Sequence, residues 1–327
     1  IVGSLATTSV ADIKYKRIFT GSGLTITYDG SKWIATGEHT DPLKRIQYST
    51  DNGETWSPYV LPSFDVSDNI ITHINHPVSN RTMYSVNNTN WNTTSNIDSI
   101  LDKTNKIYYG NNKWFAVGDG SDNTIASSTD GIFWTGEGKL FSYKGNSIYY
   151  KHGLWIAVGK DIDTKKNIAW SNDNGITWTN PSTAIMNEIN DIIFAFDYWW
   201  ICGSDATKIF KSFTGTDWTT NLAIPNYSMF LKSFFVTNTR LYIVAQVGSN
   251  HQQFQTFFVE YNGTISNHLV FGHIIRPYYN LPNWLGNIVN KGYYANGITI
   301  FAGYGGTTVT PTESQYGGCN LAITHDY

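Results

Sequence analysis

The chain has few charged residues, few cysteines and no long apolar segment. Charged residues make up 14% of its 327 positions, the formal net charge is −3 at pH 7, and lysine and arginine are scattered without a basic run. This composition gives no electrostatic basis for a nucleic-acid partner. Because no window approaches the roughly 18 apolar residues of a membrane-spanning helix, we also expect no direct membrane span.

Signatures of metals and cofactors are missing as well. Cys202 and Cys319 are too few for a disulfide framework and lack the spacing of a zinc site. Whether they pair stays open, and two buried free thiols is the favoured interpretation. His73 and His76 stand three apart in a non-helical stretch, which does not place two imidazoles on one face. No phosphate-binding or dinucleotide-binding glycine motif occurs, so we expect neither a metal nor a cofactor.

Aromatic residues and glycines are abundant instead. Aromatics reach 15% of the chain, which contains 29 glycines, 12 tryptophans and 21 tyrosines. This mixture is typical of a protein rich in strands and turns, and it is unlike a disordered chain or a coiled coil. All-β folds of this length can form one domain, so we predict a single domain over residues 1–327.

A polar turn motif ending in tryptophan recurs along the chain. The pattern S-x-D-x-G-x-T-W stands at 171–178 and 49–56, a shortened version at 128–134 and a degenerate one at 212–218. Serine and aspartate side chains accept hydrogen bonds from backbone N–H groups two or three residues on, glycine supplies a positive φ, and tryptophan covers the hairpin. The residues predicted to have this structural role are Ser49, Asp51, Gly53, Trp56, Ser128, Asp130, Gly131, Trp134, Ser171, Asp173, Gly175 and Trp178.

A second repeat, an apolar strand ending in glycine, precedes each turn. It occurs at 32–37, 113–118, 154–159 and 199–203, with looser copies at 241–245 and 298–303. These runs are too short and too rich in β-forming residues for helices. Gly118, Gly159 and Gly203 are separated by 41 and 44 residues, and a period of about 40–45 residues indicates the four-stranded blades of a β-propeller.

This period divides the chain into seven units. They begin near residues 18, 61, 101, 143, 188, 228 and 286, with an insertion at 271–285. We therefore predict an all-β fold, a single β-propeller of seven blades with four antiparallel strands each. The last unit lacks an outer strand, which Val2–Val10 would supply, closing the ring and removing exposed edges. Six or eight blades remain alternatives, because two units are inferred from spacing alone.

The two repeats together resemble the Asp-box, or BNR-like, repeat β-propellers of the sialidase-like superfamily. In that superfamily the box is a structural hairpin between the outer strands of a blade. The resemblance covers nearly the whole chain, and similar repeats are seen in uncharacterised phage, bacterial and giant-virus proteins. It implies a fold more than an activity.

The sialidase catalytic motif is not assembled in this sequence. Sialidases hold the sugar carboxylate with three arginines on different blades, since arginine offers a bidentate fork, and they use a Tyr–Glu pair and an Asp acid/base. The five arginines here are Arg17, Arg45, Arg81, Arg240 and Arg276. Arg17-Ile18-Phe19 is the nearest match to the family's R-I-P-like motif and lacks its proline. We therefore predict no enzyme activity.

A sialidase-like or other glycoside hydrolase is kept as the alternative, because glycosidases other than sialidases need only two carboxylates across a cleft. Acidic residues outside the turn motifs are few and isolated, among them Glu188, Asp191 and Asp197. We predict that these three lie in loops or cap the ends of strands.

The insertion at 271–285 is the strongest candidate for a ligand-binding surface. It contains Arg276, Tyr278, Tyr279 and Trp284, and its prolines argue against a central strand. Aromatic loops on a rigid scaffold are common binding surfaces, since tyrosine and tryptophan combine apolar area with a polar group. The alternative is that the loop packs over one end of the propeller.

Five N-x-S/T sequons mark candidate glycosylation sites, at Asn80, Asn87, Asn92, Asn226 and Asn262. They favour an extracellular or virion-surface setting. Our leading hypothesis is a non-enzymatic structural or interaction propeller that binds a protein or a glycan. An assembly factor is a further alternative, which would present a basic or apolar face instead of a pocket.

Overall fold

The chain folds into antiparallel β-sheets. The computed structural model describes residues 14–20, 23–28, 31–37, 39–41, 44–58, 72–75, 82–85, 92–93, 96–163, 166–181, 184–204, 208–223, 229–237, 240–247, 253–261, 265–270, 289–295, 298–303 and 321–325. Within these ranges there is no α-helix, and one turn of 3-10 helix, η3, spans Ile97–Ser99. The predicted all-β fold is therefore confirmed for the described residues.

Four sheets contain four strands each, and in three of them the strands follow one another in sequence. The first comprises β2 (Gly23–Tyr28), β3 (Trp33–Gly37), β4 (Ile46–Ser49) and β5 (Ser57–Pro58). The second comprises β16 (Ile189–Ala195), β17 (Tyr198–Gly203), β18 (Lys208–Ser212) and β19 (Thr220–Ala223). The third comprises β20 (Met229–Val236), β21 (Arg240–Val247), β22 (Gln253–Tyr261) and β23 (Ile265–Val270).

The fourth sheet joins the two ends of the chain. It comprises β24 (Val289–Ala295), β25 (Ile298–Gly303), β26 (Leu321–His325) and the N-terminal strand β1 (Lys14–Lys16), which pairs antiparallel with β26. The sequence predicted an N-terminal strand at Val2–Val10, a segment that lies outside the described residues. The strand that pairs is β1, a few residues farther along the chain.

The remaining strands form a three-stranded and a seven-stranded sheet. The smaller one comprises β6 (Thr72–Asn75), β7 (Thr82–Ser85) and β8 (Asn92–Thr93). The larger one comprises β9 (Lys103–Gly110), β10 (Lys113–Asp119), β11 (Ile125–Ser128), β12 (Thr135–Gly136), β13 (Lys144–Lys151), β14 (Leu154–Lys160) and β15 (Ile168–Ser171). Its two halves, β9–β12 and β13–β15, meet at a single register pair, Asp119 with Lys144.

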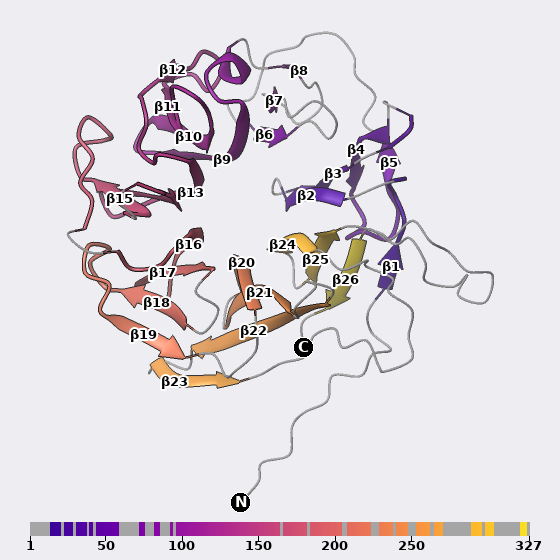
Figure 1. Cartoon of the computed structure of the whole chain (residues 1–327). Helices are drawn as coiled ribbons and strands as arrows, with labels where there is room; N and C mark the ends of the chain where they lie inside the picture. The colour runs from indigo at the N-terminus through magenta and orange to yellow at the C-terminus, as the bar shows by residue number, and fades with distance from the viewer. Residues whose placement is uncertain are drawn as a thin grey trace, which may run out of the picture.

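The sheets stand around a common centre (Figure 1). One strand of each sheet, or of each half of the seven-stranded sheet, lies nearest the centre, and its neighbours lie progressively farther out. The innermost strands are β2, β6, β9, β13, β16, β20 and β24. Neighbouring innermost strands contact one another from β9 through β13, β16, β20, β24 and β2 to β6.

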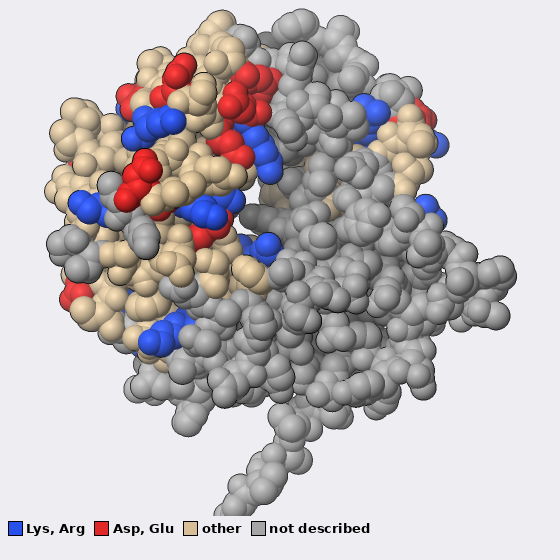
Figure 2. All heavy atoms as spheres, viewed as in Figure 1, with Lys and Arg blue, Asp and Glu red and all other residues tan. Residues whose placement is uncertain are grey.

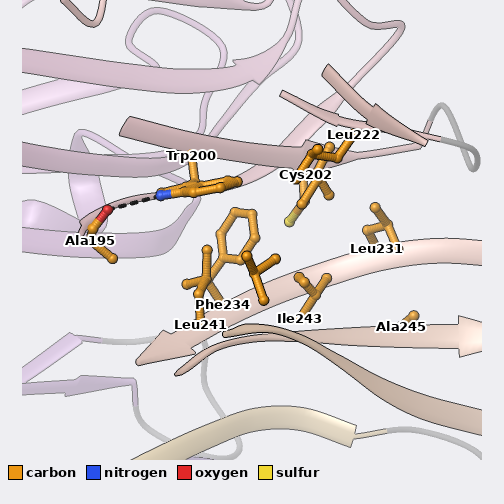
Figure 3. Close-up of a cluster of buried hydrophobic side chains, with 11 residues drawn as sticks. Ala195, Trp200, Cys202, Leu222, Leu231, Phe234, Leu241, Ile243 and Ala245 are labelled. Carbon is orange, nitrogen blue, oxygen red and sulfur yellow. Dashed lines mark hydrogen bonds between the residues drawn. The ribbon is translucent and has the colours of Figure 1, made fainter. Parts of the chain in front are cut away.

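Apolar side chains fill the spaces between neighbouring sheets. The second strands β3, β10, β14 and β17 are buried on both faces, which explains their continuous apolar runs. Figure 3 shows one such layer, in which Trp200 and Cys202 of β17 face Phe234 of β20 and Ile243 of β21. The indole of Trp200 donates a hydrogen bond to the backbone carbonyl of Ala195 (2.9 Å). Core layers thus hold adjacent sheets together.

A β-bulge recurs near the beginning of the innermost strands. In six of them one residue is skipped in the pairing with the second strand. The skipped residues are Leu24, Asn105, Asn146, Asn190, Lys232 and Asn290. A bulge bends the strand and redirects the side chain of the extra residue. The skipped residues therefore occupy equivalent places near the starts of the six innermost strands.

The bulge explains the glycine that ends each apolar repeat. A Cβ on Gly118, Gly159 or Gly203 would lie 2.0, 2.2 or 1.9 Å from a backbone carbonyl oxygen at or immediately before the start of the bulged strand. No side chain fits at that distance. The recurring glycine is therefore required by close approach of two backbones.

Candidate functional site

The four polar turns follow β4, β11, β15 and β18, and in the first three of them serine and aspartate side chains brace the turn. In the turn after β15, the N–H of Gly175 donates to Ser171 Oγ (2.8 Å) and the N–H of Thr177 donates to Asp173 Oδ1 (2.9 Å). The turn after β4 repeats both bonds, at 2.8 Å each. These bonds span four residues, one or two more than we predicted.

The extra residue in the two full motifs explains this longer span. Asn52 and Asn174 adopt left-handed conformations, with φ of 59° and 61°, and the glycine that follows each also has a positive φ. In the shortened turn after β11, Asp130 Oδ1 accepts from the N–H groups of Ile132 and Phe133, two and three residues on (2.8 Å each). Asparagine tolerates the left-handed region well.

The turn after β15 also packs against β10 in the other half of the seven-stranded sheet. A Cβ on Gly175 would lie 2.1 Å from the Phe115 ring of β10, and the Trp178 ring meets the same phenylalanine edge-on at a centroid distance of 5.8 Å. The Trp155 indole of β14, whose ring also meets Phe115, donates to the Asn174 side chain of the turn (2.9 Å). The glycine, asparagine and tryptophan of this turn therefore have structural contacts, whereas Ile176 is exposed.

These hydrogen bonds predict an acid-sensitive contribution to stability. Hydrogen bonds from the Thr177 side chain, the Thr177 backbone and Ser171 lower the pKa of Asp173 from 3.8 to about 2. Because the folded-state pKa lies below the unfolded one, the stabilisation is complete above about pH 4 and is lost as the pH falls toward 2. Unfolding of wild type and Asp173→Asn, measured by denaturant titration from pH 6 to pH 2, should show a difference that shrinks below pH 4. The control Asp217→Asn, at an exposed aspartate, should show no such convergence.

The second group of polar residues lies at the central opening. Because adjacent strands run in opposite directions, the starts of the innermost strands and the ends of the second strands lie on one side, which we call the opening face. The turns after the third strands lie on the other side. Figure 2 shows basic and acidic side chains beside the opening, over the region where β9, β13 and β16 lie in Figure 1.

An ion-pair cluster joins two sheets on the opening face. Glu188 lies immediately before β16. Its carboxylate forms ion pairs with Lys144 of β13 (Nζ to Oε1, 2.8 Å) and with Lys160 of β14 (Nζ to Oε2, 3.3 Å). Partial burial opposes ionisation of Glu188, but the hydrogen bonds and charge of Lys144, with further hydrogen bonds from Asn146 and Lys160, lower its pKa. The carboxylate is therefore ionised throughout the neutral range.

Three bulged asparagines link consecutive innermost strands. The side-chain amides of Asn105, Asn146 and Asn190 donate to backbone carbonyls of the next innermost strand, at 2.9, 2.9 and 2.6 Å. The acceptors are Gly145, Ile189 and Leu231. In the next sheet the equivalent bulge residue, in β20, is Lys232. A lysine ammonium there takes the place of the asparagine amide.

Asp191 forms a buried connection among three sheets. Its carboxylate accepts from the Ser147 hydroxyl of β13 (2.7 Å), from the N–H of Ile192 (3.0 Å) and from the N–H of Phe234 in β20 (2.8 Å). The side chain is only 6% exposed. Burial, with a contribution from this carboxylate, raises the pKa of the neighbouring Cys202 thiol, so Cys202 is a neutral, free and buried cysteine.

The prediction for the isolated carboxylates is therefore wrong for Asp191. Glu188 precedes a strand and Asp197 lies in the turn between β16 and β17, as expected of loop residues, whereas Asp191 is inside β16 and buried. The repeat carried a signal for this layer: Asn105, Asn146 and Asn190 are separated by 41 and 44 residues, the spacing of the glycine repeat.

The predicted insertion surface lies outside the described residues. This holds for Arg276, Tyr278, Tyr279 and Trp284, for Cys319, and for the sequons at Asn80, Asn87, Asn226 and Asn262. The backbone of the remaining sequon residue, Asn92, begins β8. The strands that flank the insertion, β23 and β24, belong to different sheets.

The three described arginines have local partners or lie at the surface. Arg45 and Arg240 hydrogen-bond within their own sheets or the loops that join their strands, and Arg17 is exposed between β1 and β2. In the described part of the chain, no group of three His, Cys, Asp or Glu could hold a metal ion. No helix described here is long and apolar enough to cross a membrane.

Comparison with known proteins identifies the fold but not a family. No protein-family model matches the sequence, and a search of curated proteins gives no significant match. The chain is similar in structure to YCF48 bound to a D1 peptide, with a TM-score of 0.58, 12% identity and full coverage of both chains.

Two further solved structures are similar. The extracellular domain of the one-component system BT4673 of B. thetaiotaomicron has a TM-score of 0.59 and 10% identity, over 97% of this chain and 40% of that one. The computationally designed protein Ika8 has a TM-score of 0.51 and 9% identity, over 93% of this chain and 83% of that one. YCF48 and the BT4673 domain have β-propeller-type folds. The chain has a β-propeller-type fold, and at these identities the likeness extends to the fold alone.

Proposed function

We propose that this chain is a non-enzymatic interaction module that binds a peptide segment of a partner protein on its opening face. We further propose that it is a seven-bladed propeller closed by β1, and that the polar turns are Asp-boxes with a structural role. The proposal of seven blades is supported by the innermost strands β2, β6, β9, β13, β16, β20 and β24 around one centre, and closure by β1 is supported by its pairing with β26. The proposal that the turns are structural Asp-boxes is supported by the hydrogen bonds within the turn after β15 and by its packing against Phe115 of β10.

One observation favours the opening face over the side with the polar turns as the binding surface. At the opening, consecutive sheets place polar side chains from bulged strands side by side, with Lys144, Glu188 and Lys232 contributed by three sheets in succession. A row of polar groups on a rigid scaffold suits recognition of an extended segment. The similar structure of YCF48 contains a bound peptide, which supports a peptide as the ligand of this propeller as well.

A peptide-display selection on the full chain tests the proposal. Enriched peptides would be synthesised, their Kd measured by calorimetry, and their footprint mapped by hydrogen–deuterium exchange. We expect slower exchange on binding at the starts of β9, β13, β16 and β20. The turns at 49–56 and 171–178, on the other side, serve as the internal control and should be unchanged.

A footprint on those turns, or failure of any peptide to enrich, would contradict the proposal. The insertion provides a separate outcome. If protection falls on 271–285 and both Tyr279→Ala and Trp284→Ala abolish binding, the contact surface is the insertion and the opening face is not the site.

A further inference from the structure

The lysines at the opening outnumber the carboxylates that contact them. Lys144 and Lys160 share Glu188, and Lys232 extends from the innermost strand of the following sheet. Among the described residues, Glu188 is the one carboxylate that forms an ion pair with any of these three lysines. Counting ion pairs alone, a single carboxylate serves three ammonium groups at this place.

These ammonium groups are accessible to a ligand. The side chains of Lys144 and Lys160 are 27% and 38% exposed, against 16% for Glu188, and Lys232 is exposed. Desolvation nevertheless lowers the pKa of Lys232, while Glu188 opposes this shift and Lys144 adds to it. An exposed ammonium with protein on several sides is expected at an opening rather than on a convex surface. A nearby anion would stabilise the charged form of such a lysine.

The series of bulge residues points to the same place. Asparagine occupies the bulge in three consecutive sheets and uses its amide to link each strand to the next. Lys232 takes this position in the following sheet, where a lysine supplies a flexible point charge in place of an amide. Its ammonium is thereby brought within electrostatic range of the Glu188 cluster.

We propose that Lys144, Lys160 and Lys232 bind neighbouring carboxylates of an acidic peptide segment, with Glu188 occupying part of this site in the free protein. This inference rests on the proposed peptide-binding function and specifies the chemistry of the peptide. An entering acidic side chain exchanges with Glu188 on one lysine and pairs with a second. Charge-assisted hydrogen bonds of lysine to carboxylate are shorter and stronger than neutral ones.

The test uses a fluorescein-labelled hexaglutamate peptide and the full chain, with binding followed by fluorescence anisotropy in 50 and 300 mM NaCl. Hexaglutamate should bind at least about tenfold more tightly than hexaglutamine at the lower salt, and the difference should fall at the higher salt. Lys232→Gln should weaken hexaglutamate binding about two- to fivefold, in the range of single exposed charged contacts. Lys151→Gln, at the exposed far end of β13, should leave it unchanged.

Glu188→Gln gives the most discriminating result. Removing the internal carboxylate should tighten hexaglutamate binding about threefold or more, whereas a residue with only a structural role would weaken it or have no effect. Equal binding of hexaglutamate and hexaglutamine, or equal losses in Lys232→Gln and Lys151→Gln, overturns the inference. If neutral peptides from the display selection still protect the opening face, the proposed function stands while this inference fails. A single-stranded DNA 12-mer that binds as tightly as hexaglutamate would overturn the assignment to a peptide.

Discussion

The Asp191→Ala variant should lose about 3–5 kcal/mol of unfolding free energy, since each buried donor left without a partner costs about 1–3 kcal/mol. The carboxylate accepts from two backbone N–H groups and one hydroxyl, and it is almost fully buried. Alanine removes all three acceptor contacts at once. Denaturant unfolding followed by tryptophan fluorescence measures the loss directly.

Two comparisons separate the buried network from a general effect of aspartate removal. Asp191→Asn keeps one acceptor oxygen but turns an NH2 group toward a donor, so its loss should be intermediate. Asp217→Ala, at an exposed position, should change stability by less than about 0.5 kcal/mol. If Asp191→Ala is no less stable than Asp217→Ala, the carboxylate does not join the three sheets.

Gly203→Ala should destabilise the protein by about 3 kcal/mol or more, at or beyond the upper end of ordinary overpacking. Its Cβ would lie 1.9 Å from the carbonyl oxygen and 2.9 Å from the carbonyl carbon of Glu188. Since the obstacle is backbone, no side-chain rotation relieves it, and the bulge itself must move.

Gly153→Ala is the matched comparison. That glycine has a positive φ of 81° but open space around the position of its Cβ, so alanine there adds only left-handed strain of about 1–2 kcal/mol. Thermal unfolding of both variants compares the stability lost to a close backbone contact with the stability lost to left-handed strain. We expect the larger loss for Gly203→Ala. A larger loss for Gly153→Ala would show that the glycine repeat serves conformation and that the close approach is readily relieved.

Local patterns in the sequence predicted many of the strands and the turns. Short apolar runs with β-forming residues indicated strands such as β3, β10, β14 and β17, and the spacing of their terminal glycines indicated a repeated unit. The turn motif specified its own bracing, because Ser171 and Asp173 reach backbone groups only a few residues away. These features depend on neighbours within about ten residues, so they can be recognised along the chain.

Only the tertiary structure determined what lies between the sheets. The glycine repeat gave a period but not its cause, which is a bulge in a different strand. Asp191 looked like an isolated surface carboxylate, and Lys232 resembled any other lysine, until the fold placed residues about 40 positions apart in contact. A bulge shifts which residue faces the next sheet, and that register is set by packing across sheets. The sequence by itself therefore indicated the strands and the turns, whereas the pairing of the strands into one three-stranded, one seven-stranded and four four-stranded sheets, and the polar layer that links the sheets, emerged only from their assembly.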